Sequence, residues 1–266
     1  AQPRQGWRHR GQGQRVTQAQ ERIDLGRGVR QLQIHRHDIH LDAAIPEPAL
    51  LVANHGFGGL VDLNVLAMIA VREKAALRRP TTALVHQVAW TVGAGRIAEF
   101  LDGRPASRES ADAAFAAGHN VLVFPGGDVD AAKSWRDRNQ VHFDERCGFA
   151  RLAMSHGVPV VPVVTAGAGD SLFVVSDGRR LARQLGLPRR LRMKTLPISV
   201  TIPWGLNIGV AGMLPYVALP TKLVTAVLPP MTPHTGETAE DFAARIEAAM
   251  QARLDTLVAN RKPIIG

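Results

Sequence analysis

The side chains best suited to acid–base chemistry lie in one short segment of the sequence. His55 ends an apolar run that starts at Ala49, three glycines follow it, and Asp62 comes seven positions later. Neutral imidazole accepts a proton near neutral pH, and a carboxylate on its other nitrogen stabilises the charged form. We interpret His55 as a general base that activates a hydroxyl and Asp62 as its orienting partner. A structural histidine and a helix-capping aspartate are the alternatives.

Two further segments carry small residues and an arginine where loops meet helices. The candidate binding residues are Gly103, Ser107, Arg108, Pro125, Gly126 and Gly127. Glycine lets the backbone approach a ligand closely, and an arginine adds a positive charge and several hydrogen-bond donors. Arg108 has an alternative as a surface residue that pairs with Asp112, four positions later on an expected helix. If these loops converge with the His55 segment, they provide the groups that acyl transfer needs.

The elements around these loops alternate between helices and all-apolar strands, and glycines end several helices. This order predicts an α/β fold, with a mixed, largely parallel central sheet flanked by helices. The expected strands are 49–53, 82–86, 121–124 and 158–164, and the expected helices are 62–77, 111–117, 148–156 and 237–257. In such sheets ligands bind beyond the carboxyl ends of the strands, where the candidate loops lie.

Composition divides the chain into a basic arm and one domain. Residues 1–40 hold eight arginines against three acidic residues, with eight glutamines and no lysine. Such a segment buries too little apolar area to offset its ordering entropy, so we expect a disordered or weakly helical arm. It is either a solvated tail or a contact for anionic lipid or nucleic acid. Residues 41–266 form the expected single domain.

Cysteine content and targeting signals indicate the compartment. Cys147 is the single cysteine, so the chain has no internal disulfide framework and no cysteine cluster for a metal. The first 40 residues contain no apolar stretch of the length that a secretory signal needs. We therefore expect a cytoplasmic protein, and no metal site.

Two neighbouring segments suggest an interfacial surface. Residues 179–194 carry seven basic residues and no acid, with leucines between them, which predicts a short helix that faces either a membrane surface or solvent. Residues 198–228 are strongly apolar, but prolines and glycines interrupt every long helical register, so no membrane-spanning helix is expected. Short strands joined by apolar loops fit either a buried core or membrane docking. We favour peripheral binding at the anionic inner face of the membrane.

Four sequence blocks resemble those of one enzyme family. In order along the chain they are Asn54-His55 with a following acid, Gly103 to Arg108, Phe124-Pro125-Gly126-Gly127, and Val158-Pro159-Val160-Val161-Pro162. Their order and approximate spacing resemble those of the glycerolipid and lysophospholipid acyltransferases. The passage around the third block looks more like the branch that includes diacylglycerol acyltransferase relatives. The resemblance covers roughly residues 50–230.

The resemblance implies that a fatty acyl group passes from acyl-CoA or acyl carrier protein to a lipid hydroxyl. His55 would be the base, Asp62 its partner and Arg108 a phosphate contact, with the amides of Gly126 and Gly127 as candidate oxyanion donors. The thioester is a co-substrate, and no separate cofactor is implied. Gly126 stands where the family commonly has glutamate, and the spacer between His55 and Asp62 is longer than usual. A neutral acceptor such as mono- or diacylglycerol is therefore as credible as a lysophospholipid or glycerol phosphate.

Two other classes of protein are weighed against this interpretation. Ser171 lies in a Gly-Asp-Ser-Leu sequence that one esterase group uses, but the Asp-X-X-His partner is missing before His234, and the chain lacks a Gly-X-Ser-X-Gly elbow. A basic binding module without catalysis is the other class. Aromatic residues are 5% of the chain and do not interleave with the basic runs, so lipid is favoured and nucleic acid is not expected as a partner.

Overall fold

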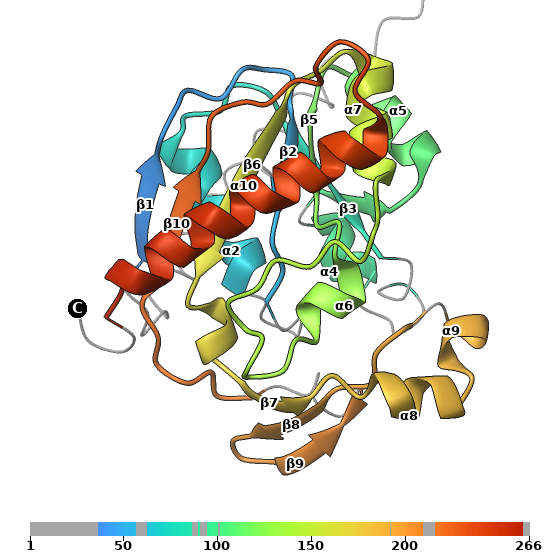
Figure 1. The fold of residues 1–266 in the computed structure, drawn as a ribbon, viewed down its shortest axis with the longest axis vertical. Coiled ribbons are helices and arrows are strands. Elements are labelled where there is room, and N and C mark those ends of the chain that lie inside the picture. The colour runs from blue at the N-terminus through green and yellow to red at the C-terminus, as the bar shows by residue number, and fades with distance from the viewer. Residues whose placement is uncertain are drawn as a thin grey trace, which may run out of the picture. The chain divides into compact units, whose positions relative to one another are not determined.

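The described part of the chain is built on a seven-stranded sheet with the order β1-β10-β6-β2-β5-β3-β4 (Figure 1). A computed structural model describes residues 37–56, 63–86, 90, 95–100, 102–191, 193–209 and 216–262. The strands from β6 to β4 are parallel, β10 is antiparallel to β6, and β1 is parallel to β10. The strands are β1 His37–Leu41, β2 Leu50–Ala53, β3 Thr81–Val85, β4 Gly103–Pro105, β5 Asn120–Val123, β6 Val160–Ala166 and β10 Leu223–Val227.

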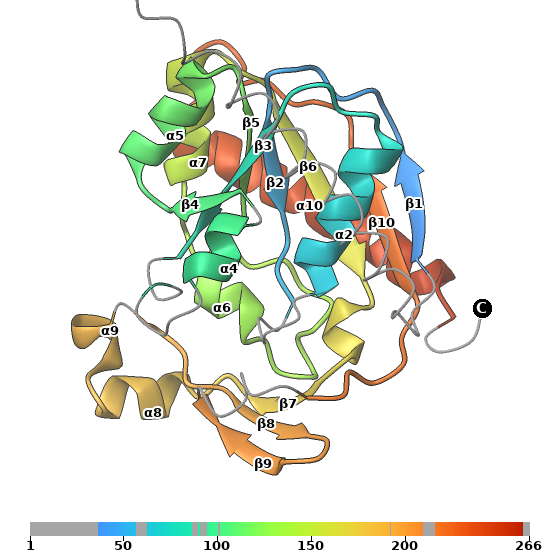
Figure 2. The ribbon, with the colours of Figure 1, turned by 180° about the vertical axis from the view of Figure 1, so that it is seen from behind.

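A small antiparallel sheet and several helices complete this part of the chain. The small sheet has the order β7-β8-β9, with β7 Phe173–Ser176, β8 Ile198–Thr201 and β9 Gly205–Ile208. The helices are α2 Leu63–Lys74, α4 Gly95–Phe100, α5 Arg108–Ala116, α6 Gly127–Ala131, α7 Gly148–His156, α8 Arg179–Gln184, α9 Leu187–Arg190 and α10 Ala239–Asn260, with a 3-10 turn η1 Ala168–Asp170. Both views show the small sheet, α8 and α9 at one end of the large sheet (Figure 2).

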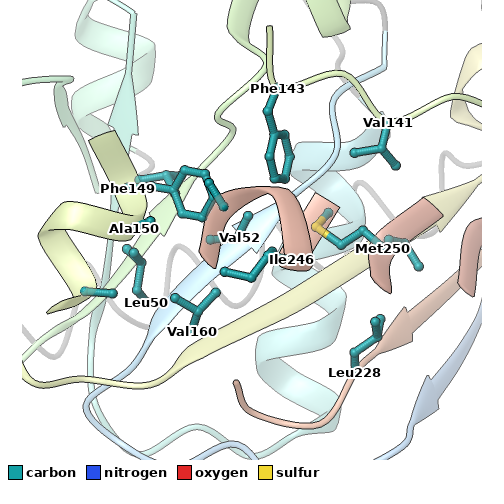
Figure 3. Close-up of a cluster of buried hydrophobic side chains, with 14 of the residues drawn as sticks. Leu50, Val52, Val141, Phe143, Phe149, Ala150, Val160, Leu228, Ile246 and Met250 are labelled. Atoms are coloured by element: carbon teal, nitrogen blue, oxygen red, sulfur yellow. The ribbon is translucent and has the colours of Figure 1, made fainter. Parts of the chain in front are cut away.

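The central strands are mostly apolar because helices cover both faces of the sheet. Alternate residues of β2 point to opposite faces: Leu50 and Val52 belong to one buried cluster, and Leu51 and Ala53 to another. Ile246 and Met250 of α10 pack into the first cluster, as do residues of α5 and α7 (Figure 3). Helix α2 contributes to the second cluster from the opposite face. The sheet therefore holds its strand ends rigidly.

The structure confirms the predicted α/β class and a mixed, largely parallel sheet. Each predicted strand and helix corresponds to an observed element within a few residues, and helix 148–156 has the predicted ends. Gly157, with φ of +61°, ends that helix as expected for a left-handed cap. Strand β1 was not predicted, and it includes the last four residues of the expected arm 1–40. The rest of the arm lies outside the described residues.

The two predicted interfacial segments are resolved into distinct elements. The basic segment forms two short helices instead of one, because Gly186 adopts a left-handed conformation between them, with φ of +69°. The apolar segment forms short strands as predicted, but they separate: β10 is buried in the large sheet, whereas β8 and β9 belong to the small sheet. In the described part of the chain, no helix has the length and apolar content needed to cross a bilayer.

Candidate active site

Two of the predicted loops meet at the carboxyl ends of adjacent parallel strands. His55 lies two residues beyond β2, and Phe124 directly follows β5, which pairs with β2 through Val52 and Val123. The His55 ring lies against the Phe124 ring, with centroids 4.8 Å apart. The structure thus brings the candidate base beside the Pro125-Gly126-Gly127 block, as the sequence predicted.

Asn54 fixes the chain immediately before His55. Its side-chain oxygen accepts from Thr165 N at 2.8 Å and its nitrogen donates to Thr165 O at 3.1 Å, so the amide imitates one more residue of strand pairing with β6. The Asn64 side chain at the start of α2 donates to Asn54 O at 2.7 Å. Because Asn54 is buried, these bonds are not exchanged with water and restrain the loop.

Asp130 of α6 accepts a hydrogen bond from the backbone N–H of His55, and the sequence analysis did not identify this residue. Its side chain is 1% exposed. One carboxylate oxygen accepts from His55 N, and the other accepts from His142 N at 3.2 Å and pairs with Lys133 Nζ at 2.7 Å. Lys133 also donates to Gln140 O at 2.6 Å. A buried carboxylate needs such donors, so Asp130 ties the base-bearing loop to α6 and to the following loop.

The signal for Asp130 in the sequence is weak. An aspartate followed three positions later by a lysine usually marks a solvated pair on one helix face. The distinguishing feature is burial of both side chains, and burial comes from the loop at residues 140–143 that covers α6. Spacing alone does not reveal that cover.

The glycines of the third block are required by close packing. A side chain on Gly126 would collide with His142 O and with the Asp130 side chain, and Gly127 has φ of +51°. Arg146 donates to the carbonyls of Pro125 and Gly126, at 3.1 Å each. The Gly127 N–H donates to Phe124 O at 3.0 Å, so this one of the two predicted oxyanion donors is already engaged.

The second block, Gly103 to Arg108, lies farther from His55 than the third block does. Gly103 begins β4 at the edge of the sheet, where a side chain would meet Ala98 O at 2.6 Å. Ser107 caps α5 by accepting from Ser110 N at 3.1 Å. The Arg108 side chain is 76% exposed and lies 3.7 Å from Asp112. Because β5 and β3 stand between β2 and β4, roughly 14 Å separates the two strand ends.

The remaining candidates have structural roles or lie outside the described residues. Asp62 is outside them. Ser171 is buried, and its hydroxyl donates to Ala168 O at 2.7 Å, which stabilises the 3-10 turn and does not present a nucleophile. Cys147 donates to Glu240 at 3.2 Å, and this bond raises the pKa of the thiol, which keeps it protonated. Among the described side chains, no group of three or more His, Cys, Asp or Glu could hold a metal ion.

Comparison with known sequences identifies related proteins. A sequence model of the acyltransferase family matches residues 35–166, a segment that includes all four blocks. A chicken protein named DGAT1/2-independent enzyme synthesizing storage lipids is 26% identical over 82% of this chain and 59% of its own length. An uncharacterised Mycobacterium leprae protein is 28% identical over 77% of this chain and 53% of its own. The chain therefore spans a little over half the length of these relatives.

Comparison with solved structures supports the fold. The crystal structure of PlsC from Thermotoga maritima, a 1-acyl-sn-glycerophosphate acyltransferase, matches with a TM-score of 0.59. The match covers 95% of this chain and 85% of that one, at 18% identity. At this level of identity the likeness concerns the arrangement of helices and strands.

Proposed function

We propose that this chain transfers a fatty acyl group from a thioester to the hydroxyl of a glycerolipid, and the match of residues 35–166 to the acyltransferase family model supports this. The observation that carries the proposal is the placement of His55. Its ring lies at the carboxyl edge of the sheet against Phe124, while Asn54 ties the preceding residue to β6 and Asp130 accepts from the His55 N–H. A base held this firmly needs little reorganisation when a substrate binds.

In the proposed reaction His55 removes the proton of the acceptor hydroxyl as its oxygen attacks the thioester carbonyl. A C–O bond forms, and the tetrahedral intermediate collapses by breaking the C–S bond. The departing thiolate takes this proton from the imidazolium and leaves as a thiol, so the enzyme returns to its starting state. Asp62 orients the imidazole in this scheme, and Gly126 N–H is the candidate donor to the oxyanion.

The third block favours a neutral acceptor such as mono- or diacylglycerol. Arg146, which lies against this block, is already engaged by two backbone carbonyls and by Asp128 at 3.1 Å. A cation bound in this way offers few donors to a phosphate. The name of the chicken relative, an enzyme that synthesizes storage lipids, also supports a neutral glycerolipid. Arg108 on the neighbouring edge is the candidate contact for a phosphate of the donor or acceptor.

The test is an acyl-transfer assay with labelled acyl-CoA or labelled acyl–acyl carrier protein as the donor. The acceptors are lysophospholipids, glycerol phosphate, and mono- and diacylglycerols. Wild-type protein and His55→Ala are compared with every pair. We expect an esterified product from wild type, most of it from a neutral acceptor, and only the blank rate from His55→Ala. Equal product from both proteins would defeat the proposal. We further propose that the enzyme works as a peripheral protein at the cytoplasmic face of a membrane, since both its acyl chains and its acceptors are lipids.

A further inference from the structure

The small sheet has its apolar residues on the outside. In the row that pairs across the three strands, Phe173, Val200 and Leu206 lie on one face, and all three are exposed, Leu206 at 68%. In the next row, Val174, Ser199 and Asn207 point inward and are buried, with Ser199 at 0%. A sheet with one solvated face normally shows the reverse order, apolar inside and polar outside.

The exposed apolar face extends beyond these three residues. Val175 on β7 and Ile208 on β9 are also exposed. The turn between β8 and β9 carries Ile202 and Trp204, the latter 52% exposed. On the inner side, the Asn207 amide donates to Thr201 Oγ1 at 2.5 Å. A contiguous exposed apolar surface of this kind is typical of an interaction site.

Arginines flank this apolar face. Helices α8 and α9 follow β7 directly, and they expose Arg180, Arg183, Arg189 and Arg190 together with Leu185 and Leu191. In both views these helices lie beside the small sheet (Figures 1 and 2). Guanidinium groups next to exposed apolar side chains complement an anionic lipid surface, which offers phosphates at the level of the headgroups and hydrocarbon below them. The same charges would repel a second copy of this surface.

The small sheet is fastened to the candidate active site. The backbone carbonyl of Val174 in β7 accepts a hydrogen bond at 2.7 Å from the N–H of Trp135, which lies in the loop that follows α6. The segment after α9 is held by Asp128 of α6, which accepts from Lys194 N at 2.6 Å. Strand β7 also follows β6 closely, through η1, at the carboxyl edge of the sheet. The small sheet therefore lies at the end of the large sheet where β2 ends, just before His55 (Figure 1).

We propose that the outer face of β7-β8-β9, with the arginines of α8 and α9, is a docking surface for an anionic lipid bilayer. Its side chains enter the headgroup region and set the carboxyl edge of the large sheet near the membrane, from which a lipid substrate reaches His55. The surface lies outside residues 35–166, the segment that the family model matches. The proposal rests on the proposed function only for that last step, since membrane binding itself requires no catalysis.

The test measures co-flotation of the full chain with vesicles of phosphatidylcholine, alone or mixed with phosphatidylglycerol, without any acyl donor. We expect binding to the mixed vesicles that weakens at high salt. Leu206→Ser/Ile208→Ser should reduce the partition coefficient about tenfold or more, because apolar area that enters the interface is lost. Arg183→Gln/Arg189→Gln should reduce it about 30-fold, from about 1 kcal/mol per cation near an anionic surface.

Matched control variants change side chains of the same kinds elsewhere. Leu41→Ser/Met154→Ser alters two exposed apolar residues away from the small sheet, and Arg78→Gln/Lys262→Gln removes two exposed cations. Both controls should float like wild type. Wild-type flotation by Leu206→Ser/Ile208→Ser would overturn the proposal, as would equal loss in the controls. A wild-type dimer that this same variant dissociates, with no vesicle binding, would instead assign the face to self-association and also overturn it.

An activity arm separates this proposal from the proposed function. With a short-chain acceptor that dissolves as monomers, Leu206→Ser/Ile208→Ser should keep the wild-type rate, while its rate on vesicles falls with its binding. Flotation by a wild-type protein that makes no product would leave the docking surface standing and refute the acyl transfer. Product formation at equal rates on vesicles by wild type and the variant would refute the docking surface alone.

Discussion

Replacing Asp130 with leucine would leave three donors facing an apolar side chain. They are the backbone N–H groups of His55 and His142 and the ammonium of Lys133. Removing one partner of a buried ion pair typically costs about 3–5 kcal/mol. We therefore expect the free energy of unfolding, measured by urea denaturation, to fall by about 4 kcal/mol, a large part of the about 5–15 kcal/mol of a typical domain.

Replacing the other partner of the ion pair, Lys133→Met, should lower the free energy of unfolding by less, about 2 kcal/mol. Two backbone N–H groups still donate to the Asp130 carboxylate in this variant. In the double variant Asp130→Leu/Lys133→Met the buried charges are gone and the two side chains pack together. Its loss of unfolding free energy should be smaller than the sum of the single losses by at least about 1 kcal/mol. Additive losses would contradict a buried ion pair at this position.

Activity separates the role of Asp130 toward His55 from its role in stability. Lys133→Met keeps the acceptor for His55 N and should stay active, whereas Asp130→Leu and the double variant should lose about tenfold or more in kcat/KM. Each rate is measured at a temperature where near-ultraviolet circular dichroism shows a folded protein. Wild-type kcat/KM in the double variant would refute the positioning of His55 by Asp130.

Three further predictions concern pH, packing and substrate contacts. Burial lowers the pKa of His37 from 6.5 to about 4. As the pH drops from 6.5 to 4, His37 therefore takes up a proton in the unfolded chain before it does so in the folded protein. The unfolding free energy should fall by up to roughly 3 kcal/mol over this range. His37→Gln should flatten that part of the urea-unfolding profile, and an unchanged slope would contradict the assignment. Gly126→Ala should abolish activity or folding because its methyl group meets the backbone of the next loop, whereas Gly148→Ala, with open space around it, should behave like wild type in both assays. Arg108→Ala should raise KM about tenfold for a phosphorylated acceptor and leave KM for a neutral acceptor unchanged; equal changes would count against a phosphate contact.

The parts of the fold that follow from local patterns were predictable. A run such as residues 121–123 is apolar throughout because both sheet faces are covered, and helix 148–156 ends where Gly157 supplies a left-handed conformation. Strand β1 escaped prediction since its sequence, HDIHL, is polar and half-exposed. Its pairing with β10 comes from a segment 186 residues away, as the partners His37 and Leu223 show. Local sequence carries no record of such a partner.

The candidate site shows the same division. His55 and the third block were found because residue type and strand ends suffice to place them at one edge. Asp130 was missed because its function depends on burial by a distant loop. For the apolar run 198–228 the sequence favoured a membrane-docking surface over a core, and the structure assigns the run to both: β10 lies in the core, and the outer face of β8 and β9 is exposed. Which face of a short strand meets solvent depends on what packs against it.

The acyl-transfer rate of His55→Gln tests the central claim most directly. Glutamine keeps the backbone N–H that donates to Asp130, and its side chain approximates the size of imidazole. It takes up no proton near neutral pH. With the preferred donor and acceptor, kcat should fall at least about hundredfold while the urea midpoint stays that of wild type. Turnover equal to wild type in this variant would contradict the role of His55 as the base.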